Sequence, residues 1–224
     1  MIPLRDDIRS EKRPYVTWGL MAACVGVFIY QTLTEYKDPK AGDLFVRAYG
    51  MIPEDIISGR HLWTLLTSMF LHGGFFHIIG NMLYLWIFGD NVEDAFGHFW
   101  YFVVYLFAGI AGSLLQVVIL PHSPVPTIGA SGAISGIMGA YFVLFPRARV
   151  LTLIPIFFFI RLIYLPAPLL LGFWILLQIL YGCSSAPGTG GGVAYFAHIG
   201  GFVSGIILGL VVRNRVRRPW YEIS

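Results

Sequence analysis

Long apolar stretches separated by short polar segments dominate the chain. Residues 95–146 contain no Lys, Arg, Asp or Glu, and neither do residues 162–212. Each is longer than one membrane crossing, which takes about 20 apolar residues, and each is interrupted by a Pro- or Gly-rich segment, at 121–126 and at 184–192. With the apolar stretches before residue 35 and after residue 60, the pattern predicts membrane-spanning helices at 15–33, 74–89, 98–120, 129–146, 165–182 and 193–212.

The connections between these spans differ in character. The first, at about 34–60, is polar, and it leads into residues 60–71, where alternating apolar and hydroxyl residues predict a helix at the membrane interface. The connection at 89–97 is short and acidic. Residues 150–164 are apolar but contain Arg161, so we expect them on the inner face and not across the membrane.

The predicted fold class is therefore all-α integral membrane: a six-transmembrane-helix bundle whose outer first loop is partly embedded in the interface. We expect a cytoplasmic tail at 1–14, one domain at 15–212 and a basic cytoplasmic tail at 213–224.

Composition and charge agree with this prediction and add an orientation. The chain is 57% hydrophobic and 12% charged, about half the charge of a soluble domain. Basic residues favour the cytoplasmic side. If the N-terminus is cytoplasmic, the only Lys and Arg residues outside are Lys37, Lys40, Arg47 and Arg60, of 15 in the chain. The net charge of +3 then reflects the inner leaflet and not nucleic-acid binding. We expect a multi-pass protein with both termini cytoplasmic, in the plasma (inner) membrane of a prokaryote.

Ser131 and His198 are polar residues inside the two uncharged stretches. Polar and ionisable groups at hydrocarbon depth are costly, and the default interpretation of such groups is functional. At 1.5 Å per helical residue, Ser131 lies about 24 Å from Arg147 and His198 about 22 Å from Arg213. The two side chains are therefore expected at one level near the outer surface. A serine beside a histidine is the minimal unit of nucleophilic hydrolysis.

Three further patterns support this pairing. Small residues share one helix face with Ser131 and another with His198, which predicts close packing of the two helices; they include Gly132, Ser135 and Gly139 on one helix and Gly201, Gly205 and Gly209 on the other. Ser131 begins its helix, where free N–H groups favour an oxyanion. His77 and Asn81 lie one turn apart at a similar depth, and both can donate hydrogen bonds to an oxyanion.

Each of these residues also has a structural interpretation. Ser131 can bond back to its own helix, His198 can make a structural hydrogen bond, and His77 with Asn81 can hold helices together. The glycines are interpreted as packing positions in either case. Four polar residues at one depth favour catalysis over packing alone. No carboxylate lies near His198 in the sequence, so a hydrolase would use a Ser–His dyad. The two cysteines, Cys24 and Cys183, suggest neither a disulfide nor a metal site, and no cofactor is expected.

These residues together resemble the rhomboid family of intramembrane serine proteases. The resemblance rests on Gly129–Gly132, on Ala197–Gly201 with Gly205, and on His72, His77 and Asn81, and it covers about residues 60–212. It implies that Ser131 is the nucleophile and His198 the base. It also implies an oxyanion hole made of His77, Asn81 and the backbone N–H of Ser131. Gly89, Glu93 and Gly97 match the family's inner turn, and the loop at 184–192 with the fifth span would be a mobile cap and lateral gate.

The sequence departs from the family at two positions. Many members have Arg after the loop Trp, where this chain has Thr64. Some members stack an aromatic ring under the histidine from the position that is Ser135 here, so His198 must be held otherwise, by a hydroxyl or a water. The substrates implied are single-span membrane proteins, within membrane lipid. A non-catalytic binder of transmembrane segments is the rival hypothesis. A transporter is less favoured, because no carboxylate lines the core and no inverted repeat is visible.

Overall fold

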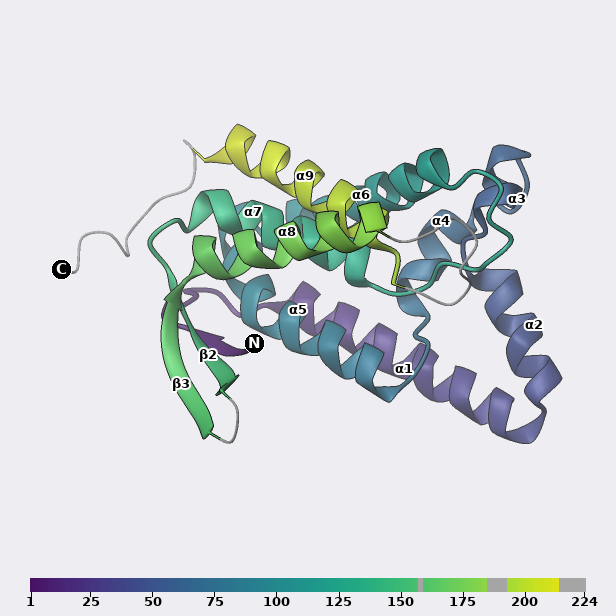
Figure 1. Ribbon diagram of the computed structural model, residues 1–224, viewed down its shortest axis with the longest axis horizontal. Coiled ribbons are helices and arrows are strands. Elements are labelled where there is room, and N and C mark those ends of the chain that lie inside the picture. The colour runs from purple at the N-terminus through teal and green to yellow at the C-terminus, as the bar shows by residue number, and fades with distance from the viewer. Residues whose placement is uncertain (157–158, 185–192, 214–224) are drawn as a thin grey trace.

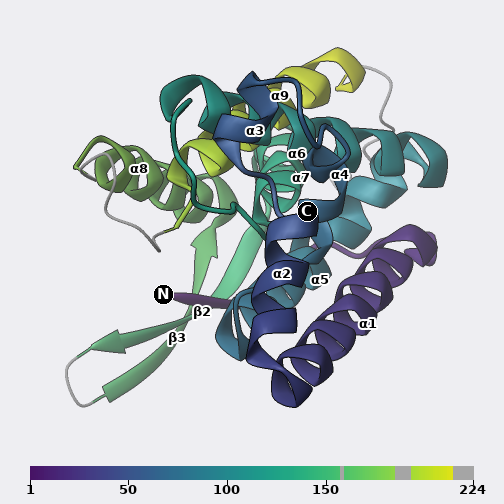
Figure 2. The same ribbon diagram turned by 90° about the vertical axis from the view of Figure 1, so that its right-hand side faces the viewer.

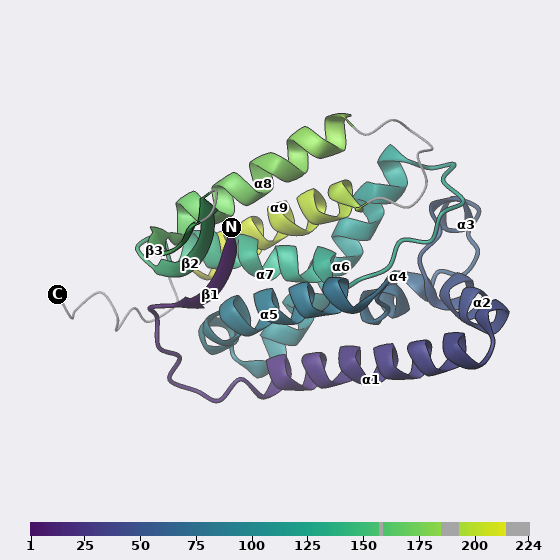
Figure 3. The same ribbon diagram turned by 60° about the horizontal axis from the view of Figure 1, so that its bottom comes forward.

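Among the described residues, six long helices form the body of the protein and overlap the six predicted spans, although the second ends at Phe96 and not at residue 89. The computed structural model describes residues 1–156, 159–184 and 193–213. The helices are α1 (Tyr15–Lys37), α5 (Phe75–Phe96), α6 (His98–Ile119), α7 (Ser131–Leu144), α8 (Ala167–Ser184) and α9 (Tyr195–Val212). They run alongside one another (Figure 1), with α1 and α8 on opposite flanks (Figure 3).

The described helices identify the chain as a multi-pass membrane protein. Four of them, α1, α6, α8 and α9, are long and apolar enough to cross a membrane. A fifth crossing arises if α5 is joined with the short helices α4 (Thr64–Thr67) and η1 (Ser68–Phe70), from which it is bent by 95°. Helix α7 has 14 residues, which rise about 21 Å. The sixth crossing therefore stays a prediction.

Helix α7 lies at the centre of the bundle, packed against α5, α6 and α9 (Figure 2). Its apolar and small residues are buried almost all round. The contact with α9 is made at backbone level: a Cβ atom on Gly201 would overlap the carbonyl oxygen of Gly132, and one on Gly205 would overlap that of Gly136. Such small-residue contacts are how helices approach closely in lipid.

The all-α prediction is wrong at one end of the molecule, where three strands form an antiparallel sheet in the order β1-β2-β3. The strands are β1 (Ile2–Asp6), β2 (Arg149–Ile156) and β3 (Phe159–Pro166). Strands β2 and β3 pair antiparallel, with Thr152 opposite Ile163, and β1 pairs Ile2 with Leu153. A short apolar run rich in β-branched residues suits a strand, but its period alone does not distinguish a strand from a helix.

Two predicted connections are largely helical in the structure, and two other predicted segments fall outside the described residues. The polar segment at 34–60 contains two helices, α2 (Pro39–Tyr49) and α3 (Pro53–Ile57). Asp38 caps α2 by accepting a hydrogen bond from the Lys40 N–H, and Pro39 suits its first turn. The acidic segment at 89–97 is mostly helical, because α5 continues to Phe96 and turns at Gly97 with a φ of 75°. The cap loop at 184–192 and the tail at 213–224 lie almost wholly outside the described residues.

Candidate active site

Ser131 is the first residue of the central helix α7. The turn before it depends on Gly129, whose φ of 127° is a conformation that L side chains rarely adopt. Gly129 also has no room for a side chain, since a Cβ atom there would lie 2.7 Å from Nε2 of His77. Its N–H donates to the Ser68 carbonyl oxygen at 2.9 Å, which fixes the turn against η1.

His198 lies on α9 with its imidazole directed at Ser131. The distance between His198 Nε2 and Ser131 Oγ is 2.7 Å, which is a hydrogen-bonding distance. His198 is buried, with 7% of its surface exposed. The backbone contacts between α7 and α9 set this distance. The two residues predicted to pair from their depths are therefore in contact.

Gln178, on α8, holds the other nitrogen of His198. The distance between His198 Nδ1 and Gln178 Oε1 is 2.8 Å. Trp174, one turn earlier on α8, lies beside the imidazole with ring centroids 5.7 Å apart and planes inclined by 35°. The sequence analysis missed both residues. One feature of the sequence could have pointed to Gln178: it is the only amide or charged residue in the apolar run 162–212.

The sequence analysis expected a hydroxyl or a water to hold His198. The hydroxyl of Ser135 does not do so. Its hydroxyl donates to the carbonyl oxygen of Ser131 at 2.6 Å, one turn earlier in the same helix. This is the back-bonding common for serine within helices. The place of a stacking ring is taken instead by Trp174, from a different helix.

His77 lies on α5 beside Gly129, and Asn81 lies one turn later on the same helix. His77 Nδ1 accepts a hydrogen bond from the Gly73 N–H at 3.3 Å, so the ring proton belongs on Nε2, the atom nearest Gly129. Asn81 is buried, and among the described residues its Nδ2 has no hydrogen-bond partner. Buried amide donors are nearly always paired, so this donor calls for an explanation.

The segment that leads into α5 is held in place by an amide bridge. Gln31, on α1, donates from Nε2 to the His72 carbonyl oxygen at 2.9 Å and accepts from the His72 N–H at 3.3 Å. The ring of His72 lies 5.2 Å from that of His77, measured between centroids. His72, part of the resemblance, is thus fully buried beside His77 and bound to α1 through Gln31.

A small cavity of about 10 Å³ adjoins Ser131, lined also by Gly129, Ala194 and Ala197. This volume is close to the space that one water molecule occupies. The cavity gives the serine a polar, confined neighbourhood between α6, α7 and the start of α9.

Glu93, matched above to the family's inner turn, joins three helices at the opposite end of the molecule. Its carboxylate accepts hydrogen bonds from the N–H groups of Val16 and Thr17 at 2.9 and 2.8 Å, and from the Thr17 hydroxyl at 2.7 Å. His98 Nδ1 lies 2.6 Å away, at the start of α6. A carboxylate at the first turn of α1 also suits the helix dipole. Glu93 therefore ties α1 and α6 to the end of α5.

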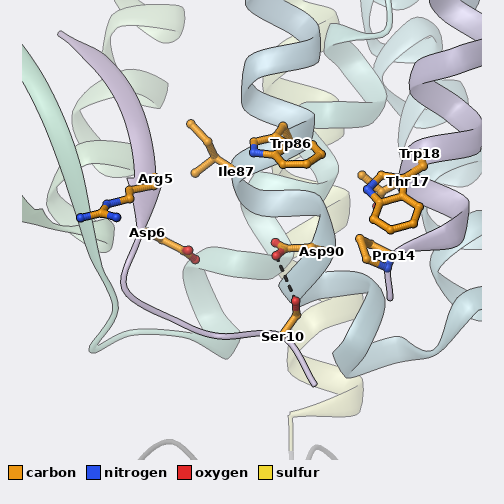
Figure 4. A pocket seen from close by; sticks show the side chains of 9 residues that line it. All are labelled: Arg5, Asp6, Ser10, Pro14, Thr17, Trp18, Trp86, Ile87 and Asp90. Carbon is orange, nitrogen blue, oxygen red and sulfur yellow. Dashed lines mark hydrogen bonds between the residues drawn. The ribbon is translucent and has the colours of Figure 1, made fainter. Parts of the chain in front are cut away.

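A cavity of about 290 Å³ lies at the same end, between β1, α1 and α5 (Figure 4). Asp6 and Asp90 approach it from facing elements, and Trp18 and Trp86 form its rim. Burial raises the pKa of Asp6 from its ordinary value of 3.8 to about 7. No serine–histidine pair lies here among the described residues, so this cavity is separate from the Ser131 site.

A partly buried serine in contact with a buried histidine, inside a bundle of membrane-spanning helices, defines a class of membrane protein with a candidate nucleophile in its helical core. The chain belongs to the rhomboid family: residues 59–215 match the family model described as the Rhomboid domain.

Relatives from several organisms support this assignment. The chain is 31% identical over 93% of its length to "RHOMBOID-like protein 6, mitochondrial" of Arabidopsis thaliana, covering 64% of that protein. It is 28% identical over 78% of its length to "Rhomboid protein 1, mitochondrial" of Saccharomyces cerevisiae, covering 48% of it. A shorter region, 42% of the chain, is 42% identical to "Rhomboid protease GluP" of Bacillus subtilis, covering 18% of it. The chain thus spans about half to two thirds of the length of the Arabidopsis and yeast relatives. Their mitochondrial names do not favour the prokaryotic membrane expected from the sequence.

Proposed function

We propose that the protein is an intramembrane serine endopeptidase that cuts single-span membrane proteins near the outer ends of their transmembrane segments. The observation that carries the proposal is the 2.7 Å hydrogen bond between Ser131 Oγ and Nε2 of the buried His198. Family membership and the similarity to a protein named a rhomboid protease point the same way.

In the proposed reaction, Ser131 is the nucleophile and His198 the general base. Ser131 Oγ attacks the carbonyl carbon of the scissile peptide bond while its proton passes to His198 Nε2. The imidazolium then gives that proton to the nitrogen of the leaving amine, and the C–N bond breaks. Water, deprotonated by the same imidazole, hydrolyses the acyl ester and restores the serine hydroxyl.

The oxyanion of the tetrahedral intermediate has donors close at hand. Ile134 N–H donates to the Ala130 carbonyl oxygen, so the N–H of Ser131 precedes the hydrogen-bond ladder of α7 and is free for a ligand. We assign Asn81 Nδ2 and His77 Nε2 as the side-chain donors, because the first is buried without a partner among the described residues and the second carries the ring proton beside Gly129.

The substrate must unwind to be cut. A peptide bond in a helix has its carbonyl bonded four residues on, and freeing it in hydrocarbon leaves backbone groups unsatisfied. Unwinding is feasible near the outer surface, where water reaches and where the depth estimate from Arg147 and Arg213 puts the dyad. Both chain termini are then cytoplasmic, as the distribution of basic residues favours.

Purified protein in lipid vesicles, incubated with a panel of single-span substrates, tests the proposal. The parent should cleave at least one substrate and react with a serine-directed fluorophosphonate, whereas Ser131→Ala and His198→Ala should do neither. Ser135→Ala removes a hydroxyl one turn away and should keep both properties. Cleavage by Ser131→Ala at the parental rate would contradict the assignment. Retention of substrates without cleavage or labelling by the parent would favour the binder.

A further inference from the structure

Gln178 is a buried amide on a helix that is otherwise apolar. It lies in the middle of α8, the helix on the flank of the bundle, whose main partner among the described elements is α9. Neighbouring side chains of α8 such as Leu176 and Ile179 are exposed on the outside of the bundle, but Gln178 faces inward and has 9% of its surface exposed. Its oxygen lies 2.8 Å from His198 Nδ1.

The orientation of this amide is fixed by a second contact. Gln178 Nε2 lies 3.5 Å from the carbonyl oxygen of Trp174, which can only accept a hydrogen bond. The NH₂ group therefore faces the backbone, and the oxygen faces the imidazole. Because an amide oxygen only accepts, the proton of a neutral His198 must be on Nδ1.

This tautomer is the one that a general base needs. With the proton on Nδ1, His198 Nε2 has a free lone pair, and it is this nitrogen that lies 2.7 Å from Ser131 Oγ. The other tautomer would place a proton on Nε2, so that the imidazole could not take the serine's proton. In a serine-protease triad an aspartate selects this tautomer and also stabilises the imidazolium by its charge.

We propose that Gln178 is a positioning residue that selects the Nδ1-protonated tautomer of His198 and holds its ring toward Ser131. It supplies the acceptor that a triad aspartate supplies, but without the negative charge. This inference rests on the proposed function, because it concerns the same dyad. It also gives the site a third member that comes from α8, whereas Ser131 and His198 come from α7 and α9.

Four variants test the inference in vesicles. Gln178→Leu and Gln178→Met remove the amide acceptor and introduce an apolar side chain of similar size. If one of the two variants folds poorly, the other serves in its place. Gln178→Glu keeps an acceptor oxygen whether or not its carboxyl is ionised. Leu176→Ala, on the exposed face of the same helix, is the matched control. The measurements are kcat and KM on a cleaved single-span substrate, and thermal unfolding in detergent.

A second measurement reads the tautomer itself. Nitrogen NMR of protein labelled with ¹⁵N-histidine separates protonated from unprotonated ring nitrogens. The signals of His198 are assigned by subtracting the spectrum of His198→Ala. This readout does not depend on catalysis, so it still tests Gln178 if the parent proves to be inactive.

We expect Gln178→Leu and Gln178→Met to lower kcat about 10- to 100-fold. This is the loss of rate expected when the His198 N–H loses its acceptor and the resulting free-energy cost raises the transition state. KM should stay within about threefold of the parent, since no substrate contact is lost. The NMR signal of protonated Nε2 should appear in both variants. Gln178→Glu should retain kcat within about tenfold, and Leu176→Ala should match the parent.

Parental kcat and an unchanged tautomer in Gln178→Leu and Gln178→Met would overturn the inference. A fall in thermal stability with no change in kcat or tautomer would do the same and leave Gln178 a helix-packing residue. If Ser131→Ala abolishes cleavage while these variants do not affect it, the proposed function stands and the role of Gln178 fails alone.

Discussion

The carboxylate of Asp6, at the end of β1, accepts a hydrogen bond of 2.5 Å from the hydroxyl of Tyr141 on α7. Ser131 begins the same helix, so this bond ties the N-terminal strand to the element that carries the candidate nucleophile. Asn91 Nδ2 on α5 donates to the same carboxylate at 2.8 Å. Asp6 thus joins the sheet to two of the helices that form the Ser131 site.

This arrangement makes stability depend on pH. Burial is the largest cause that raises the pKa of Asp6 to about 7; the nearby carboxyls of Asp90 and Asp7 act in the same direction, and the Tyr141 hydrogen bond acts against them. The folded state therefore favours protonated Asp6. The resulting stability is fully present below pH 3.8, the ordinary value, and is lost as the pH rises through about 7.

The corresponding experiment compares the parent with Asp6→Asn by thermal unfolding in detergent between pH 5 and 8.5. The unfolding temperature of the parent should fall relative to that of Asp6→Asn as the pH rises, because asparagine does not ionise. Parallel curves across this range would show that ionisation of Asp6 has no part in holding β1.

Loss of an oxyanion donor is expected to slow the chemical step. Asn81→Ala and His77→Ala should each lower kcat by about 10²–10³, as for such donors in a soluble protease. Asn91→Ala changes the same residue type on the same helix, at the opposite end of the molecule, and should affect thermal stability but not kcat. A variant of Asn81 or His77 that raises only KM would assign that residue to substrate binding.

Backbone packing between α7 and α9 makes Gly205 intolerant of a side chain. A Cβ atom there overlaps the carbonyl oxygen of Gly136, which cannot move aside as a flexible side chain would. Gly205→Ala should therefore lower the free energy of unfolding by about 1–3 kcal/mol and reduce cleavage. Gly26→Ala, in α1, is the control, because nothing lies within 4 Å of its Cβ position. Equal unfolding temperatures for the two variants would contradict this packing.

Substrate selection should follow the cost of unwinding. Gly, Pro or polar residues beyond the scissile bond lower that cost, so replacing them with Leu should suppress cleavage while the residues at the cleavage site stay unchanged. The measurement is the initial rate on matched substrate pairs in vesicles. If the Leu-stabilised span is cut as fast as the original, helix unwinding does not select the substrate.

The helices were predictable because their signal is local. An apolar run of sufficient length, bounded by Arg, Pro or Gly, defines α1, α6, α8 and α9 without knowledge of their neighbours. The sheet was not predictable in this way. Strand β1 is paired only through β2, which lies almost 150 residues later in the chain, and the apolar hairpin has no period that separates strand from helix.

The same distinction holds for the site. The depths of Ser131 and His198 follow from helix rise, and their proximity was therefore predictable. The contact of Gln178 with His198 depends on the rotation of α8 about its axis, which is set by packing against α9 and not by any pattern within α8. A single glutamine in an apolar helix looks the same in sequence whether it faces a neighbouring helix or an imidazole.

Two kinds of contact hold the imidazole of His198, and they respond differently to motion. Backbone atoms of α7 and α9 are in direct contact, and this contact sets the separation of the helices that carry Ser131 and His198. In the inference above, the side chain of Gln178 on α8 determines which ring nitrogen carries the proton. A membrane segment that displaced α8 outward would leave the backbones of α7 and α9 in contact but would remove Gln178 from His198, so that neither the direction of the ring nor the position of its proton would be held. In the proposed protease, entry of a substrate beside α8 would therefore suspend cleavage until that helix returned, and cutting would follow only after the flank had closed.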